Sequence, residues 1–163
     1  MAQAFNMLIA NSRFKKLLKI FAILLIVVTV IFFGYCNNTR LANKQTVAFY
    51  QQLKDSLKAR GYSTSLLVIS TKRFTWHNWI QVWLSGASRK SKHVDGDAID
   101  FLVFDINRDG SANKEDIDIV YNLLDKEIIR DKGGIGTYKT DKHIMNRKMV
   151  HIDCRGGRTR WHR

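Results

Sequence analysis

Two imidazoles and one carboxylate in the C-terminal part of the sequence have the residue types of a metal site. His93 and Asp100 lie seven residues apart, and Gly96 between them permits a turn. His151 lies on an expected strand, where side-chain alternation places it on the same face as Asp153. Two histidines and one aspartate, with a fourth position open for water, suit a catalytic zinc ion. The same residues also fit a simpler interpretation, in which His151 is structural and the spacing of the other two is incidental.

Residues 105–116 have the spacing of a calcium-binding loop. Oxygen-bearing residues stand at positions 1, 3, 5, 7, 9 and 12 of the loop, namely Asp105, Asn107, Asp109, Ser111, Asn113 and Asp116. Gly110 at position 6 allows the sharp turn that such loops need, and Ser111 would contribute its backbone carbonyl. We predict a structural Ca²⁺ here. The alternative is a metal-free acidic loop that caps the following helix.

Apolar periodicity predicts the elements that position these residues. Helical spacing indicates helices over residues 45–60, 75–84 and 114–129. Short apolar runs predict strands over residues 65–70, 98–104 and 149–153, and the glycines of residues 133–136 indicate a tight turn. Strands interleaved with helices, without a regular crossover repeat, predict an α+β domain with a small antiparallel sheet and flanking helices.

Three tryptophans share one face of the expected helix over residues 75–84. Trp76, Trp79 and Trp83 recur at helical spacing. We interpret this stripe as a packed core face, because burial of large aromatic side chains dominates the energetics of cores. The alternative is a platform for a ligand.

The N-terminal segment combines a basic flank with an apolar run. Four basic residues precede Ile20, and residues 20–36 contain no charge. We predict an uncleaved membrane anchor over residues 1–36, with a domain over residues 37–163 on the periplasmic or extracellular side. The alternatives are a buried core helix, a cleaved signal peptide, and a lipoprotein signal with Cys36 as the lipidated residue.

The net charge limits the class of partner. With 27 Lys+Arg against 14 Asp+Glu, the chain of 163 residues carries a formal charge of +13. Such basicity suits nucleic acid, an anionic membrane or an anionic polymer. The basic residues form no recognised nucleic-acid motif, so we predict that nucleic acid is not the partner. Two cysteines cannot build a disulfide scaffold.

Three motifs resemble a peptidase family. The segment SKHVDGDAID is similar to the S-x-H-x-x-G-x-A-x-D signature of zinc D-alanyl-D-alanine carboxypeptidase-like peptidases. Their superfamily also includes lysostaphin-type endopeptidases and the hedgehog signalling domain. The run GGIGTY…MVHIDCRGGRTRW resembles the ending of a peptidoglycan-hydrolase branch, and KRFTWHN resembles its Y-R-S-x-x-x-N segment. The loop over residues 105–116, with Asp at position 12, resembles dockerin-type loops more than sensor EF-hands.

The resemblance implies an activity and a ligand set. It implies zinc on His93, Asp100 and His151, and a peptidase that hydrolyses peptide bonds of peptidoglycan as a carboxypeptidase or an endopeptidase. It also implies that Arg73 and Asn78 bind the substrate.

The proton acceptor is the point where the sequence departs from the family. Relatives carry an acid or a histidine where this chain has Lys148 and Met149. Asp153 is the nearest remaining carboxylate and would act as the base or orient a ligand imidazole, and Asp141 and His143 are further candidates. The departure keeps a catalytically inactive cell-wall-binding module as the alternative function.

Calcium should raise the melting temperature of the protein if residues 105–116 bind it. At a free calcium concentration of one hundred times Kd, binding to the native state alone raises the free energy of unfolding by about 2.7 kcal/mol. Asp105→Ala should abolish the rise, whereas Asp118→Ala, outside the loop, should keep it. Thermal unfolding with and without calcium measures both effects, and a parent protein that does not respond to calcium contradicts the prediction.

Overall fold

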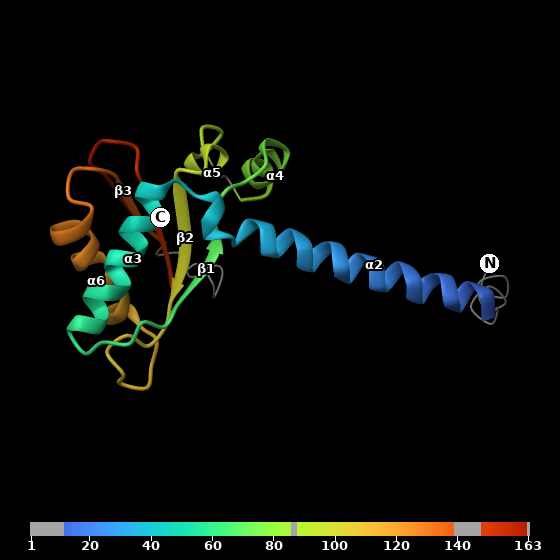
Figure 1. The fold of residues 1–163 in the computed structure, drawn as a ribbon, viewed down its shortest axis with the longest axis horizontal. Coiled ribbons are helices and arrows are strands. Elements are labelled where there is room, and N and C mark those ends of the chain that lie inside the picture. The colour runs from blue at the N-terminus through green and yellow to red at the C-terminus, as the bar shows by residue number, and fades with distance from the viewer. Residues whose placement is uncertain (1–11, 86–87, 139–147, 163) are drawn as a thin grey trace. The chain divides into compact units, whose positions relative to one another are not determined.

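The computed structural model describes residues 12–85, 88–138 and 148–162. The chain divides into two compact units, Met1–Tyr35 and Cys36–Arg163, which we call the N-terminal and C-terminal units. Helix α2 (Ser12–Cys36) runs through the described part of the N-terminal unit (Figure 1). The candidate metal ligands all belong to the C-terminal unit.

Helix α2 is helical as predicted, but the membrane-spanning assignment is not supported. Among the described residues, no helix has the length and apolarity needed to cross a membrane. The first turns of α2 contain Arg13, Lys15, Lys16 and Lys19, and they precede the uncharged residues 20–36.

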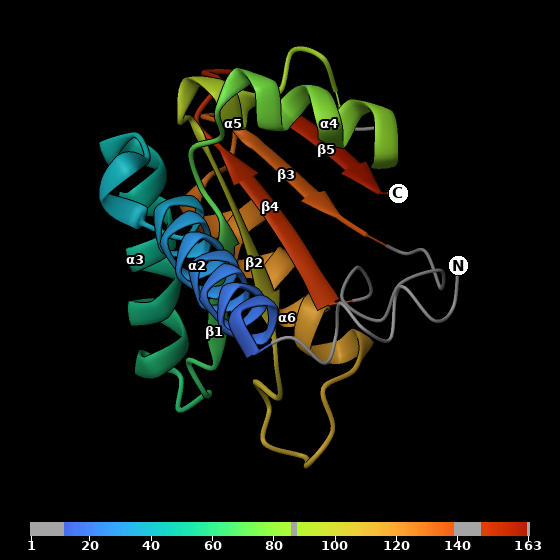
Figure 2. The same cartoon turned by 90° about the vertical axis from the view of Figure 1, so that its right-hand side faces the viewer.

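The C-terminal unit is an α+β domain built on a five-stranded sheet. Its strands are β1 (Leu66–Ser70), β2 (Ala98–Val103), β3 (Gly134–Thr137), β4 (Met149–Asp153) and β5 (Thr159–His162). They lie in the order β1-β2-β4-β3-β5 (Figure 2). The predicted antiparallel sheet is therefore only partly right, because β3 and β5 pair in parallel and the sheet is mixed.

The described helices of the C-terminal unit are η1 (Thr39–Leu41), α3 (Lys44–Ala59), α4 (Thr75–Ser85), α5 (Lys92–Asp95), α6 (Lys114–Leu123) and η2 (Leu124–Ile128). Periodicity predicted α3, α4 and the stretch of α6 and η2, and side-chain caps begin η1, α3, α5 and α6. Asn43 caps α3 by accepting a hydrogen bond from Gln45 N at 2.9 Å. Asn113 and Asp116 form a reciprocal capping box at the start of α6. Such caps satisfy amide groups that a helix leaves unbonded.

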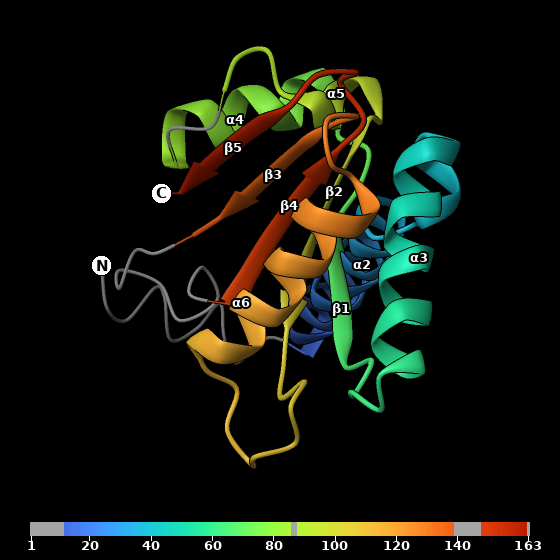
Figure 3. The same cartoon turned by 90° about the vertical axis from the view of Figure 1, so that its left-hand side faces the viewer.

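The hydrophobic core lies between one face of the sheet and helices α3 and α6 (Figure 3). Alternation along the strands sends every second side chain to this face. The core is formed by residues such as Ile99, Phe101, Ile135, Val150 and Ile152 from the sheet, with Leu53, Leu57 and Val120 from the helices. The other residues of the same strands face the opposite side, where the candidate metal ligands lie.

The predicted turn over residues 133–136 is wrong, because Gly134–Thr137 is strand β3. Its glycines do not form a turn but allow side chains of neighbouring strands to lie close to the backbone. A Cβ at Gly134 would overlap the carboxylate of Asp153, and a Cβ at Gly136 would overlap the ring of Trp161. Glycine therefore lets β3 pass beside two bulky side chains of its neighbouring strands.

The predicted burial of the tryptophan stripe is also wrong. Trp76, Trp79 and Trp83 are 57%, 72% and 79% exposed on α4. The side of α4 that carries Asn78 is the buried one, since Asn78 is 4% exposed. Periodicity identified the helix and its apolar face correctly, but periodicity does not state which face meets the domain.

Asp125 of η2 ties strand β5 to the domain. Its carboxylate accepts hydrogen bonds from Arg160 Nε at 2.6 Å and from Arg158 Nη2 at 3.1 Å. Burial raises the pKa of Asp125, but the two guanidinium groups outweigh burial and the net pKa is lowered. This pair holds β5, which carries Trp161 toward the candidate site.

Asp125→Asn should lower the free energy of unfolding by about 1 kcal/mol, because it removes a largely buried charge-assisted pair. Since the native pKa is depressed, this contribution is present above about pH 4 and is lost as the pH falls through the native pKa. Urea unfolding between neutral and acid pH measures it. Asp131→Asn is the matched control, because Asp131 contacts the same Arg158 at 3.7 Å but is 84% exposed. Equal effects of the two variants would contradict the prediction.

Candidate metal centre

Strand register brings distant residues into one row across the sheet. Asp100 of β2 lies opposite His151 of β4, and His151 lies opposite Gly136 of β3. Gly136 in turn lies opposite Trp161 of β5. Directly opposed residues on neighbouring strands point to the same face. The row therefore sets a carboxylate, an imidazole and an aromatic ring side by side on the face away from the core.

The one-turn helix α5 places His93 against this row. Ser91 caps the helix by accepting a hydrogen bond from His93 N at 3.4 Å. Gly96 ends it in the left-handed region at φ 82°, a conformation that glycine adopts without steric cost. Asp97 N then donates to Lys92 O at 2.9 Å as the chain turns into β2. The serine and the glycine of the motif thus have structural roles, which set the separation of His93 from Asp100.

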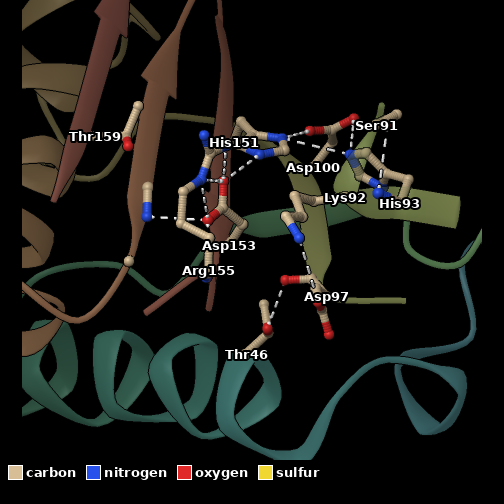
Figure 4. Close-up of polar contacts among 12 residues, drawn as sticks. Thr46, Ser91, Lys92, His93, Asp97, Asp100, His151, Asp153, Arg155 and Thr159 are labelled. Carbon is tan, nitrogen blue, oxygen red and sulfur yellow. Dashed lines mark hydrogen bonds and ion pairs between the residues drawn. The ribbon is translucent and has the colours of Figure 1, made fainter. Parts of the chain in front are cut away.

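The three predicted zinc ligands converge (Figure 4). His93 Nε2 lies 3.0 Å from Asp100 Oδ2, and His151 Nδ1 lies 2.7 Å from Asp100 Oδ1. The two imidazole nitrogens are 3.3 Å apart. One ligand atom from each residue lies within 4.8 Å of the others, and all three residues are buried. Among the described residues, this is the only such group of three or more His, Cys, Asp or Glu that could hold a metal ion.

Hydrogen bonds on the far sides of both imidazoles orient their metal-facing nitrogens. His93 Nδ1 lies 2.6 Å from the carbonyl of Thr71, and His151 Nε2 lies 3.2 Å from Asp153 Oδ2. A carbonyl or a carboxylate only accepts, so His93 Nδ1 and His151 Nε2 each carry a hydrogen toward these partners. By the same rule His151 Nδ1 donates to Asp100 Oδ1 when the ring is protonated, and a bound cation would take the place of that hydrogen. Ligand histidines of metal sites are held in this way. The donor set and its supports therefore suit a metal ion.

The cluster is electrostatically coupled. Burial lowers the pKa of His93. Burial lowers the pKa of His151 as well, but hydrogen bonds to Asp100 and Asp153 outweigh it and raise the pKa to about 9. Burial raises the pKa of Asp100, whereas the two imidazoles bring it well below its usual range. The site thus stabilises an anionic Asp100 with a positive charge beside it, which is also what a bound cation requires.

Arg73 is at the site, but its guanidinium contacts a ligand. Arg73 Nη2 donates to Asp100 Oδ2 at 2.8 Å, and its Nε donates to Ser70 Oγ at 2.9 Å. Arg73 also lines the cavity in front of the cluster, where the predicted contact with substrate would occur. Asn78, the other predicted substrate residue, is buried and donates to the carbonyl of Ser88, a residue of the cavity wall, at 3.2 Å.

An open cavity of about 380 Å³ gives access to the cluster. It is lined by Arg73, Ser88, Lys90, Ser91, Lys92, His93, Asp100, Tyr138, His151, Arg155 and Trp161. Four lining residues are basic and one is acidic, so the cavity favours an anionic group. Tyr138 and Trp161 meet edge to face at a centroid separation of 5.2 Å.

Sequence reasoning assigned no role to Tyr138, Arg155 or Trp161 in the cavity. Tyr138 and Trp161 belong to the quoted C-terminal motif, and this was the signal that could have found them. Arg155 lies in the same quoted run, but its place in the cavity depends on the turn between β4 and β5.

Asp153 contacts His151 and not the open cavity. It is fully buried, and it also accepts hydrogen bonds from Gly134 N at 3.0 Å and Arg155 Nε at 2.8 Å. Burial raises its pKa, but the bonds to His151 and Arg155 outweigh burial and depress it. So acidic a carboxylate is a weak proton acceptor, and of its two predicted roles the geometry favours orienting His151. Asp141 and His143 lie outside the described residues.

The predicted calcium loop is organised by hydrogen bonds to its own backbone. Asp105 accepts from Asp109 N at 3.1 Å and from Gly110 N at 3.0 Å. Asp116 is fully buried and accepts from Ile106 N at 2.7 Å as well as capping α6. These bonds suit the metal-free capping loop, and calcium at this loop stays a prediction.

Comparison with known proteins gives no relative. No family model, no curated protein and no solved structure matches the chain. The resemblance to zinc peptidases therefore stays a prediction, and the geometry described here concerns metal binding alone.

The cluster of His93, Asp100 and His151 should bind one zinc per chain. Metal analysis and calorimetry of the purified protein measure this stoichiometry. His151→Ala should abolish binding, because two ligands remain. Asp153→Asn should weaken binding about 10- to 100-fold, since it disturbs the orientation of His151. His162→Ala is the matched control, because His162 is exposed and outside the cluster. Unchanged zinc affinity in His151→Ala would contradict the assignment.

Proposed function

We propose that the protein is a zinc-dependent peptidase that hydrolyses peptide bonds of peptidoglycan. The observation that carries the proposal is the buried cluster of His93, Asp100 and His151, which opens onto a basic cavity. Two histidines and one aspartate form a three-ligand set with room for water or substrate. The motif resemblance supplies the reaction class, and a peptidoglycan substrate would place the C-terminal unit on the periplasmic or extracellular side.

His93, Asp100 and His151 would hold the zinc ion, which when bound lowers the pKa of a water molecule and polarises a carbonyl oxygen. The chain's own residues prepare this site. Thr71 and Asp153 hold the imidazoles in the required tautomers. Arg73 donates to Asp100, which helps to stabilise a charged ligand in a buried place.

The basic cavity supports a peptide substrate that carries carboxylates. Lys90 and Lys92 stand in the wall of the cavity together with Arg73 and Arg155. Stem peptides of peptidoglycan carry such carboxylates, and a guanidinium binds them with paired hydrogen bonds. Trp161 and Tyr138 provide apolar surface for the rest of the peptide. Recognition of a terminal carboxylate would make the enzyme a carboxypeptidase, and recognition of an internal one an endopeptidase.

A second candidate is a catalytically inactive cell-wall-binding module. It is favoured by one observation, namely that Asp153 is engaged by His151 and Arg155 while Lys148 stands where relatives of the resembled family carry an acid. In an active enzyme, Asp141 or His143 would accept the proton.

Purified protein should release amino acids or peptides from isolated peptidoglycan. Chelation should abolish release, and zinc should restore it. His151→Ala should lower the rate at least about 100-fold, because removal of a ligand removes the metal's contribution to the transition state. His162→Ala should remain active. Comparison of Asp141→Asn with Asp153→Asn at saturating zinc tests which residue takes the proton, because Asp153→Asn is also expected to weaken zinc binding.

One outcome would favour the second candidate over the first. Protein that holds zinc stoichiometrically, sediments with peptidoglycan and releases nothing from it is a binding module.

A further inference from the structure

Helix α4 is amphipathic with its apolar face outward. Five of its six apolar residues recur at positions i, i+3, i+4, i+7 and i+8, which form one stripe of a helix. The five are Trp76, Trp79, Ile80, Trp83 and Leu84, each between 39% and 79% exposed, while the sixth, Val82, is half-buried outside the stripe. The other face carries His77, Asn78 and Gln81, of which Asn78 is buried and donates to Ser88 O. Surface helices of globular proteins normally turn the apolar stripe inward.

The outward stripe is too large and too aromatic to be incidental. Single exposed apolar residues are common, but contiguous exposed patches mark sites of interaction. Trp79 and Trp83 are 72% and 79% exposed and lie one helical turn apart. Tryptophan is the residue enriched where one side of a surface is apolar and the other is hydrated, as at the boundary of a lipid bilayer.

All charged residues near α4 in the sequence are basic. Between Asp55 and Asp95 the sequence contains seven Lys or Arg and no Asp or Glu. Arg89 and Lys90, which follow α4, are exposed. Basic residues beside an apolar face are the features of a segment that binds an anionic membrane surface.

We propose that α4 is a lipid-docking helix, which inserts Trp79, Trp83 and Leu84 into the interface of a bilayer that contains anionic phospholipid. The indole rings enter the boundary between headgroups and acyl chains, and Arg89 contacts the phosphate layer. This inference is independent of the proposed peptidase activity, because it uses no residue of the candidate metal centre or of the cavity wall.

The experiment uses the emission of the full chain's tryptophans with lipid vesicles. The four tryptophans are Trp76, Trp79, Trp83 and Trp161, so α2 contains none. In Trp161→Phe all remaining emission comes from α4. On mixing with vesicles of phosphatidylcholine and phosphatidylglycerol, this emission should shift to shorter wavelength and be quenched by brominated acyl chains. Because α2 is silent, any lipid binding of its own does not enter the signal.

Two variants test the roles of the indole rings and of the charge. Trp79→Ser with Trp83→Ser should weaken partitioning onto the vesicles about tenfold or more, since two large apolar groups lose their burial. Leu67→Ser is the matched control, because Leu67 is an exposed apolar residue of β1 at 51% exposure, and it should change nothing. Arg89→Glu should weaken binding to anionic vesicles and leave binding to phosphatidylcholine alone unchanged.

Three results would overturn the proposal. The first is binding of the full chain to vesicles without quenching of the α4 tryptophans. The second is an emission shift with soluble glycan fragments of peptidoglycan and none with vesicles, which would make α4 a sugar platform. The third is a shift that depends only on protein concentration, which would make the stripe a contact between two copies of the chain.

Discussion

The burial of a single carboxylate governs the arrangement of the C-terminal unit. Asp100 is 2% exposed on β2, and an ionised carboxylate taken out of water must be compensated by opposite charge or hydrogen bonds. Strand β4 supplies His151 directly opposite, α5 supplies His93, and the chain after β1 supplies Arg73. Each element is thereby held at the same point of the sheet. A cation at this point would add to the compensation, which is why the geometry suits a metal.

The two faces of the sheet have different contents, a hydrophobic core on one and the candidate metal centre on the other. One face packs large aliphatic side chains against α3 and α6, and it needs no polar partners. The other face carries the row from Asp100 to Trp161, in which each polar group has a named partner. Gly134 and Gly136 of β3 have no side chains, and this leaves room beside the strand for the side chains of Asp153 and Trp161. The same glycines that weaken a strand in isolation are required by its neighbours.

Helix α4 links the outer surface of the unit to the cavity. Its buried residue, Asn78, binds the carbonyl of Ser88, and Ser88 lines the cavity in front of the metal cluster. A membrane surface bound by the tryptophans would therefore be connected to the cavity wall by a single hydrogen bond. All charged residues from 72 to 92 are basic. They would suit both proposals, because the proposed substrate and the proposed membrane both present anionic groups.

The sequence alone determined the parts of this protein that depend on local spacing. Helical periodicity located α3, α4 and α6, and apolar runs located β1, β2 and β4. The Ser-His-Gly-Asp spacing pointed to His93 and Asp100 of the candidate metal centre, and the strand pattern pointed to His151. Tertiary structure decided what depends on neighbours far along the chain. Gly134 and Gly136 let β3 lie against Asp153 and Trp161. Strand β5 pairs with β3 in parallel, and Asp125 binds its Arg160 from a helix far along the chain. The outward face of α4 was equally undetermined, since the period of a helix identifies an apolar stripe but contains no information about the direction in which the rest of the chain lies.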